Sequence, residues 1–208
     1  TTPNADQRAI AELHTYARPA GSRTERKFIN RYVATLPGAT RDVHGNWHVL
    51  VGQDSPILWS CHTDTVARSG GRQRVFLDTA GILSLDPSEC DSPATSLPSS
   101  LLTPQPSTRS GKDRRPAGTR NCLGADDTAG VWLLREMIKA GIAGHYVFHY
   151  AEERGAIGSS DLARENPAWL ADILVAVAFD RAGTGDVITY QYGDRCASDT
   201  FAESLAAS

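Results

Sequence analysis

Four short polar clusters stand out in this sequence of 208 residues. They are His62-Thr-Asp64, Asp126-Asp127, Glu152-Glu153 and Asp180, and together they hold one imidazole and six carboxylates. Imidazole and carboxylate groups are the usual protein ligands of borderline and hard divalent cations such as Zn²⁺ and Mn²⁺. A carboxylate next to such ligands that does not itself bind the metal can act as a general base. The residue types therefore indicate a divalent metal site with a proton acceptor beside it.

Each cluster also has a simpler explanation when it is taken alone. A His two residues before an Asp arises easily by chance in a chain with six histidines. Asp126-Asp127 could be the first turn of a helix, where carboxylates interact favourably with the helix dipole. Glu152-Glu153 could be a solvated turn, and Asp180 could simply end a strand. The four clusters in this order, each next to an expected strand or helix, favour the metal site.

The elements that must position these clusters can be read from apolar periodicity and from Gly and Pro. We expect strands at 57–61, 146–150, 173–179 and 186–192, hairpins at 43–51 and 74–85, and helices at 4–17, 22–38, 126–140, 158–166 and 198–207. Ser22 and Glu25 have the spacing of a capping box at the start of the second helix. The strand at 173–179 is apolar throughout and is expected to be fully buried.

Strands that alternate with helices predict an α/β fold. We expect a mixed, mostly parallel central sheet with helices on both faces, a three-layer sandwich. In such sheets, ligands bind outside the carboxyl ends of the strands, which is where three of the polar clusters stand. Residues 1–208 are expected to form one catalytic domain. The chain ends within a helical pattern, so the domain is expected to be truncated at its C-terminus.

Four stretches carry a resemblance to a known superfamily: SCHTDTV at 60–66, LGADDTAG at 123–130, AEERGAIGS at 151–159, and Phe179-Asp180. They resemble the co-catalytic two-zinc exopeptidases, which include tripeptidase T, the acetylornithine and succinyl-diaminopimelate deacylases, and zinc aminopeptidases. The resemblance extends from 57 to 180, apart from the segment 87–120. The DDTAG piece is closer to the tripeptidases and the EERGAIGS piece to the aminopeptidases.

The resemblance implies a role for each candidate residue. His62 and Asp180 would hold one zinc ion, Glu153 would hold the second, and Asp126 would bridge both. Asp64 would hydrogen-bond the free ring nitrogen of His62 and so fix its tautomer and orientation. Glu152 would stay unligated as the general base. These roles agree with elementary chemistry, because a cation lowers the pKa of a bound water to about 7 and a neighbouring carboxylate can then take its proton.

The function implied by the resemblance is hydrolysis of peptide or amide bonds by a zinc-dependent exopeptidase of the aminopeptidase or tripeptidase type. The cofactor would be two Zn²⁺ ions, with Mn²⁺ or Co²⁺ as substitutes, and the substrate a short peptide. An N-acyl amino acid deacylase is the alternative with the same fold. Self-association into a homo-oligomer stays open.

One element of the superfamily pattern is missing, because no His follows Asp180. The second zinc would then have only oxygen ligands, Asp126 and Glu153, which suit Mg²⁺ or Mn²⁺ better than Zn²⁺. We therefore expect one tightly bound zinc, a weaker second metal and little hydrolysis. A catalytically inactive metal-binding relative is the competing hypothesis, although an unligated Glu152 favours an enzyme.

Composition excludes several other functions. With 21 basic and 24 acidic residues the net charge is −3, which argues against a nucleic-acid partner, and the longest apolar run has seven residues, far fewer than the ~20 that span a bilayer. Half of the 34 positions at 87–120 are Pro, Ser or Thr, so this segment is expected to be a disordered insertion. The four cysteines form no Cys-x-x-Cys pair and no signal peptide is visible, so the predicted compartment is the cytoplasm.

Overall fold

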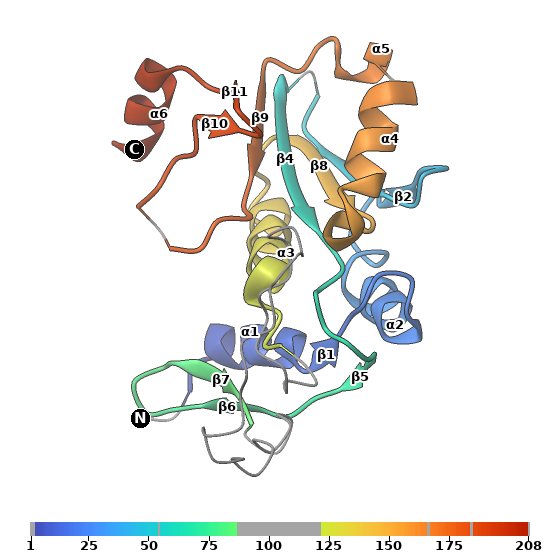
Figure 1. Ribbon diagram of the computed structural model, residues 1–208, viewed down its shortest axis with the longest axis vertical. Helices are drawn as coiled ribbons and strands as arrows, with labels where there is room; N and C mark the ends of the chain where they lie inside the picture. Colours follow the sequence, from blue (N-terminus) through green and yellow to red (C-terminus); the bar gives the residue numbers. More distant parts are fainter. Residues whose placement is uncertain (1–2, 54, 87–121, 166, 184, 208) are drawn as a thin grey trace, which may run out of the picture.

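The computed structural model describes residues 3–53, 55–86, 122–165, 167–183 and 185–207. Its central feature is a five-stranded sheet of order β2-β3-β8-β4-β9. The strands of this sheet are β2 (Thr40–Arg41), β3 (Trp47–Val51), β4 (Ile57–His62), β8 (Gly144–His149) and β9 (Val175–Ala178). Figure 1 shows β4 and β8 in the middle of the upper half of the molecule, with helices in front of and behind them. The segment 87–120, for which the sequence predicts a disordered insertion, lies outside the described residues.

Helices cover both faces of the sheet. The first face packs against α1 (Ala5–His14), α2 (Arg23–Tyr32) and α3 (Ala125–Lys139), and the second against α4 (Ile157–Glu165) and α5 (Pro167–Leu170). Successive side chains of β8 point to opposite faces of the sheet. Tyr146 and Phe148 pack in the hydrophobic core on the first face, and Val147 packs in the core on the second. This alternation is what a strand buried on both faces requires. The prediction of an α/β fold with a mixed sheet between two helical layers is confirmed.

The pairing pattern is less parallel than predicted. Strand β4 runs parallel to both of its neighbours, β8 and β9, whereas β3 pairs antiparallel with β2 and with β8. The reason is that β2 and β3 form a hairpin, in which neighbouring strands must run antiparallel, and both strands belong to this sheet. Its turn is held by Asp42, whose side chain accepts hydrogen bonds from the backbone N–H groups of His44 and Asn46.

Two smaller pairs of strands lie below the sheet in Figure 1. Strand β1 (Tyr16–Ala17) pairs with β5 (Gly71–Arg72), and β6 (Val75–Leu77) forms the expected hairpin with β7 (Leu83–Leu85). The first helix is shorter than predicted, since it ends at His14 and the chain then turns into β1. The second helix begins at the predicted cap, with the Ser22 hydroxyl accepting a hydrogen bond from the Glu25 N–H at 3.0 Å, but the capping box is not completed because the Glu25 carboxylate accepts the N–H of Gly21 instead.

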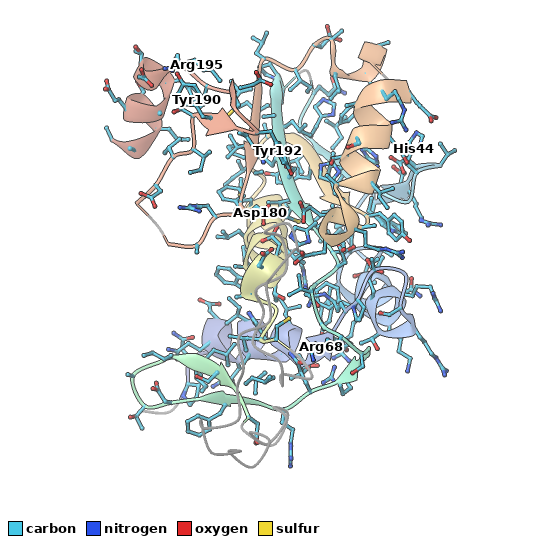
Figure 2. All side chains as sticks on the ribbon, viewed as in Figure 1. His44, Arg68, Asp180, Tyr190, Tyr192 and Arg195 are labelled. Carbon is cyan, nitrogen blue, oxygen red and sulfur yellow. The ribbon has the colours of Figure 1, made fainter. Side chains whose placement is uncertain are left out.

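The C-terminal elements differ most from the prediction. Strand β9 is shorter than the predicted 173–179, and its residues alternate between half-buried and exposed because β9 stands at the edge of the sheet. The predicted strand at 186–192 is instead the hairpin of β10 (Tyr190–Gln191) and β11 (Asp194–Arg195), followed by α6 (Asp199–Ala206) as expected. Figure 2 shows Tyr190 and Arg195 on this segment, away from Asp180. None of the helices in the described ranges is long and apolar enough to cross a lipid bilayer.

Candidate functional site

His62 is the centre of the candidate site. It is the last residue of β4, the strand that has parallel neighbours on both sides, and its side chain is only 2% exposed. The carboxyl ends of these strands lie at one edge of the sheet, so the loops that follow them converge on His62. Turn η3 (Glu152–Arg154) follows β8, and Asp180 follows β9.

Asp64 joins His62 to the turn after β8. Its buried carboxylate lies 3.3 Å from His62 Nδ1 and accepts hydrogen bonds from the backbone N–H groups of Glu152 and Glu153, each at 3.1 Å. The chain reverses at Ala151, whose φ of 53° lies in the left-handed region. One carboxylate thus orients the imidazole and fixes the turn that carries two further carboxylates.

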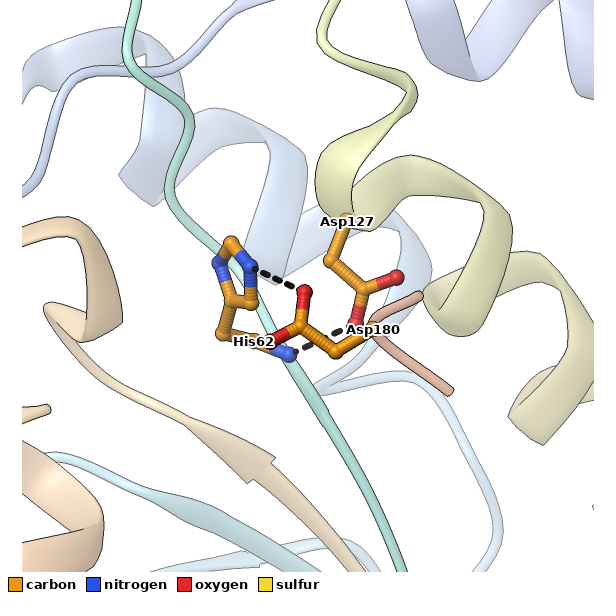
Figure 3. Close-up of side chains that lie close together, drawn as sticks. All are labelled: His62, Asp127 and Asp180. Carbon is orange, nitrogen blue, oxygen red and sulfur yellow. Dashed lines mark hydrogen bonds and ion pairs between the residues drawn. The ribbon is translucent and has the colours of Figure 1, made fainter. Parts of the chain in front are cut away.

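Three carboxylates from different elements face the other ring nitrogen. His62 Nε2 lies 2.8 Å from Asp126 Oδ1, 3.4 Å from Asp180 Oδ1 and 4.0 Å from Glu152 Oε2. Figure 3 shows Asp180 beside the imidazole ring and Asp127 beyond Asp180, joined to the backbone nitrogen of His62. These carboxylates are only partly buried, so the ring nitrogen points into a site that solvent can reach.

Asp127 lies beside Asp126, but its side chain has different partners. One carboxylate oxygen accepts the backbone N–H of His62 at 3.1 Å, and the other accepts the N–H of Gly130 at 2.8 Å. The peptide bond between Asp126 and Asp127 is cis. Burial raises the pKa of Asp127 to about 8. Asp127 therefore ties the end of β4 to the first turn of α3, beneath the exposed Asp126.

The electrostatics of the site are those of a cation-binding pocket. Burial disfavours protonation of His62, but hydrogen bonds to Asp126, Asp180 and Asp64 raise its pKa to about 12. Burial, together with the negative charge of Asp126, raises the pKa of Glu153 to about 7. Burial also raises the pKa of Glu152. Negative charge is thus crowded around one imidazole, and a bound cation would relieve that repulsion.

The donor atoms have the spacing that a divalent cation requires. Ligand atoms held about 2.0–2.2 Å from one cation lie roughly 3–4 Å from each other, and the distances at His62 Nε2 span this range. Two groups of possible ligands meet in the described residues, His62 with Asp127 and Asp180, and His62 with Glu152 and Glu153. In addition, Glu153 Oε1 is buried and has no hydrogen-bond partner among the residues that the structure describes. The residues present therefore fit a divalent metal.

The structure brings all six predicted site residues to one edge of the sheet. His62, Asp126, Asp180, Glu152 and Glu153 surround one region, and Asp64 lies behind His62. The position of Asp64 agrees with an orienting role better than with direct contact to a substrate, because its side chain is completely buried.

Sequence reasoning missed three supporting residues. The sequence places Asp127 in the same polar cluster as Asp126 but assigns it no role of its own. Arg18 and Glu25 are buried below the site, and Glu25 accepts a hydrogen bond from the Thr63 hydroxyl at 2.8 Å. No local pattern in the sequence distinguishes these two from surface residues. The imidazole of His149 lies with Nδ1 3.4 Å from Asn46 Oδ1 and belongs to neither candidate ligand group in the described residues.

Gly130 tests how firmly Asp127 is held. A Cβ at position 130 would overlap the Asp127 carboxylate, whereas a Cβ at Gly71 would meet nothing within 4 Å. Ala normally stabilises a helix interior relative to Gly by about 1 kcal/mol. We nevertheless expect Gly130→Ala to lower the free energy of unfolding by about 1–3 kcal/mol, the usual cost of overpacking. Urea denaturation, with Gly71→Ala as the control, measures this, and a Gly130→Ala protein as stable as wild type would show that Asp127 moves freely.

Comparisons with known proteins support the fold. No family model matches this sequence, and no curated protein matches it either. Among solved structures, the chain is similar to the crystal structure of a tripeptidase from Staphylococcus aureus subsp. aureus Mu50, with a TM-score of 0.55 and 18% sequence identity. The match covers 86% of this chain and 43% of the tripeptidase, so this chain spans less than half of that protein's length. At this identity the similarity shows a peptidase-like fold.

Proposed function

We propose that this chain carries the metal site of a peptidase-like hydrolase that cleaves peptide or amide bonds. One observation carries the proposal: β4, α3, η3 and the end of β9 each deliver a metal-ligating side chain to the same edge of the sheet. Three segments that bring carboxylates to the one buried imidazole at the end of a fourth are not explained by helix capping or by solvated turns. The fold of a tripeptidase is consistent with this activity.

The ligands we propose are His62, Asp126 and Asp180 for a first zinc ion, with Asp126 and Glu153 for a second. A divalent cation bound there would acidify a water molecule and polarise the carbonyl group of a substrate. The first set leaves room for water and is sufficient for a catalytic zinc. The second set has only oxygen donors and suits Mn²⁺ or Mg²⁺ as well as zinc.

The protein's own contribution to the reaction is proton transfer and orientation. Glu152 Oε2 lies 4.0 Å from His62 Nε2 and its side chain is 34% exposed, so it can accept a proton from water at the site. The same carboxyl can then pass the proton to the departing amine. Asp64 bonds to His62 Nδ1 and to the backbone N–H of Glu152. It therefore fixes the position of the proton acceptor Glu152 relative to the metal ligand His62.

The reaction type we favour is that of an aminopeptidase or tripeptidase, with a short peptide as substrate. Removal of an acyl group from an N-acyl amino acid would use the same residues. Partly exposed carboxylates around His62 fit either substrate, because both present an amide carbonyl to the site.

The experiment combines metal titration with a substrate panel. We expect the metal-free protein to bind one Zn²⁺ tightly and a second metal more weakly in calorimetry. The zinc-loaded protein should then hydrolyse tripeptides or amino-acid anilides slowly, because the second metal is held weakly, and a chelator should abolish that activity. Faster release from N-acyl amino acids would identify a deacylase. A protein that binds zinc but cleaves neither class would be an inactive metal-binding relative, and one that binds no divalent metal would contradict the whole proposal.

A further inference from the structure

Arg18 lies buried beneath the candidate site and has no part in the proposed chemistry. It follows β1, and in the described residues it is the one arginine or lysine whose side chain is buried, with 0% exposure. A guanidinium carries a charge and five N–H donors, so burying it is costly unless its hydrogen bonds and its charge are compensated. The groups that accept its hydrogen bonds and balance its charge therefore indicate the role of the Arg18 side chain.

The guanidinium bridges two segments that carry site residues. Its Nε donates to the carbonyl oxygen of Thr63 at 2.7 Å, directly after His62. Its Nη2 donates to the hydroxyl of Thr128 at 2.8 Å, directly after Asp127. The guanidinium also stacks on the ring of Phe28 at 4.0 Å, which fixes its plane. The end of β4 and the first turn of α3 are thus joined through one side chain.

The backbone around Arg18 strengthens this link. Its N–H donates to the Thr65 hydroxyl at 3.1 Å, and its carbonyl oxygen accepts the Thr65 N–H at 2.8 Å. The segment 63–65, which contains Asp64, is therefore bonded to Arg18 at both ends.

Arg18 also places a buried positive charge among the buried acids of the site. Glu25, Asp127 and Asp64 are buried, and all three interact electrostatically with the guanidinium. Burial lowers the pKa of Arg18 to about 10, and these carboxylates oppose that shift, so Arg18 remains charged at neutral pH. Without Arg18, three acidic groups would share a buried region with no cation from the protein other than His62.

We infer that Arg18 is a positioning residue, which holds Asp64 and Asp127 in their ligand-supporting positions before any metal is bound. This inference deepens the proposed function and rests on it, because it assigns Arg18 to the same site. A guanidinium that served only as core packing would be replaceable by an apolar side chain of similar length. A positioning role instead requires both the charge and the two-sided hydrogen bonding.

The test uses amide hydrogen exchange in the metal-free protein, followed by NMR. The N–H groups of His62 and Gly130 report on Asp127, and those of Glu152 and Glu153 report on Asp64. We expect Arg18→Met to accelerate exchange at these four amides by at least ~10-fold, because the end of β4 and the first turn of α3 lose the hydrogen bonds that join them and open locally more often. Amides of Tyr146–Phe148 in β8 should keep their wild-type rates.

Arg135→Met is the matched control. Like Arg18, Arg135 places its guanidinium over an aromatic ring of α2, that of Tyr32 at 5.1 Å, although it is only half-buried. Its titratable neighbours in the described residues are Glu136 and Tyr32, and none of the site carboxylates is among them. It should leave the four reporter amides unchanged. Wild-type exchange at those amides in Arg18→Met, or equal acceleration in β8, would overturn the positioning role.

If Arg18→Met does not fold, Arg18→Lys tests the positioning role of Arg18 instead. Lysine keeps the charge but cannot reach Thr63 and Thr128 with a planar fork, so intermediate acceleration is expected. Wild-type protection in Arg18→Lys would overturn the inference. A parallel Zn²⁺ titration should show affinity weakened at least ~10-fold in Arg18→Met. If the wild-type chain binds no Zn²⁺, the proposed function fails, whereas the metal-free exchange data still judge the positioning by Arg18.

Discussion

Replacing Glu152 with Gln is expected to lower kcat for peptide hydrolysis by at least ~10²-fold while bound zinc stays near the wild-type level. The expectation rests on geometry, since Glu152 Oε2 is the farthest of the three carboxylate oxygens from His62 Nε2, at 4.0 Å. Gln has the same shape and keeps the backbone bond to Asp64, but it cannot accept a proton at neutral pH.

The measurement is kcat together with zinc per chain by elemental analysis. Glu136→Gln is the matched control, because Glu136 lies on the partly exposed side of α3, where it pairs with Lys139 away from the site. It should change neither quantity. If Glu152→Gln loses its zinc along with its activity, Glu152 is a ligand and the proton acceptor must be sought elsewhere.

The core and the ends of the central strands could be predicted from the sequence because their signals are local. The apolar run of β4 and the alternation in β8 require burial on both faces, and the polar residue that follows each strand must then lie at the sheet edge. For this reason His62, Glu152 and Asp180 could be placed together without a structure, whereas Asp126, which begins a helix, was placed with them through the resemblance.

The parts that could not be predicted depend on contacts between distant segments. An apolar run such as 173–179 reads as fully buried, yet β9 pairs only with β4 among the described strands and remains half exposed. Arg18 and Thr128 are 110 positions apart in the sequence, and nothing near either residue signals their hydrogen bond. Periodicity reports which face of an element is apolar, but it does not report which partner covers that face.

The adjacent residues Asp126 and Asp127 illustrate the same limit within the site. Taken alone, the residue types do not distinguish the two carboxylates, and the bridging role was given to Asp126 by the resemblance. The structure separates them by burial and by partners: Asp126 is 65% exposed and bonds to His62 Nε2, whereas Asp127 is buried and bonds to two backbone N–H groups. A carboxylate that already accepts two N–H groups has less capacity to hold a cation.

This difference leads to the expectation that Asp126→Ala releases both metals. Asp126 is the one candidate for a bridging ligand, so its removal should weaken zinc affinity by more than the ~10–100-fold that loss of an outer-sphere partner costs. Stability should change little, because the side chain is mostly exposed. Asp161→Ala is the control, as Asp161 lies on α4 and pairs with Arg164.

Asp127→Asn should behave in the opposite way. Asn can still accept a hydrogen bond through Oδ1, but its amide nitrogen cannot accept the second N–H, so one of the two bonds that join β4 to α3 is lost. We expect the free energy of unfolding to fall by about 1–3 kcal/mol, the usual cost of a buried hydrogen-bonding group left without its partner. Zinc should still bind to the folded fraction. Zinc titration and urea denaturation of both variants separate the roles: if Asp127→Asn loses zinc while folded and Asp126→Ala retains it, then Asp127 is the ligand and the assignment of Asp126 is wrong.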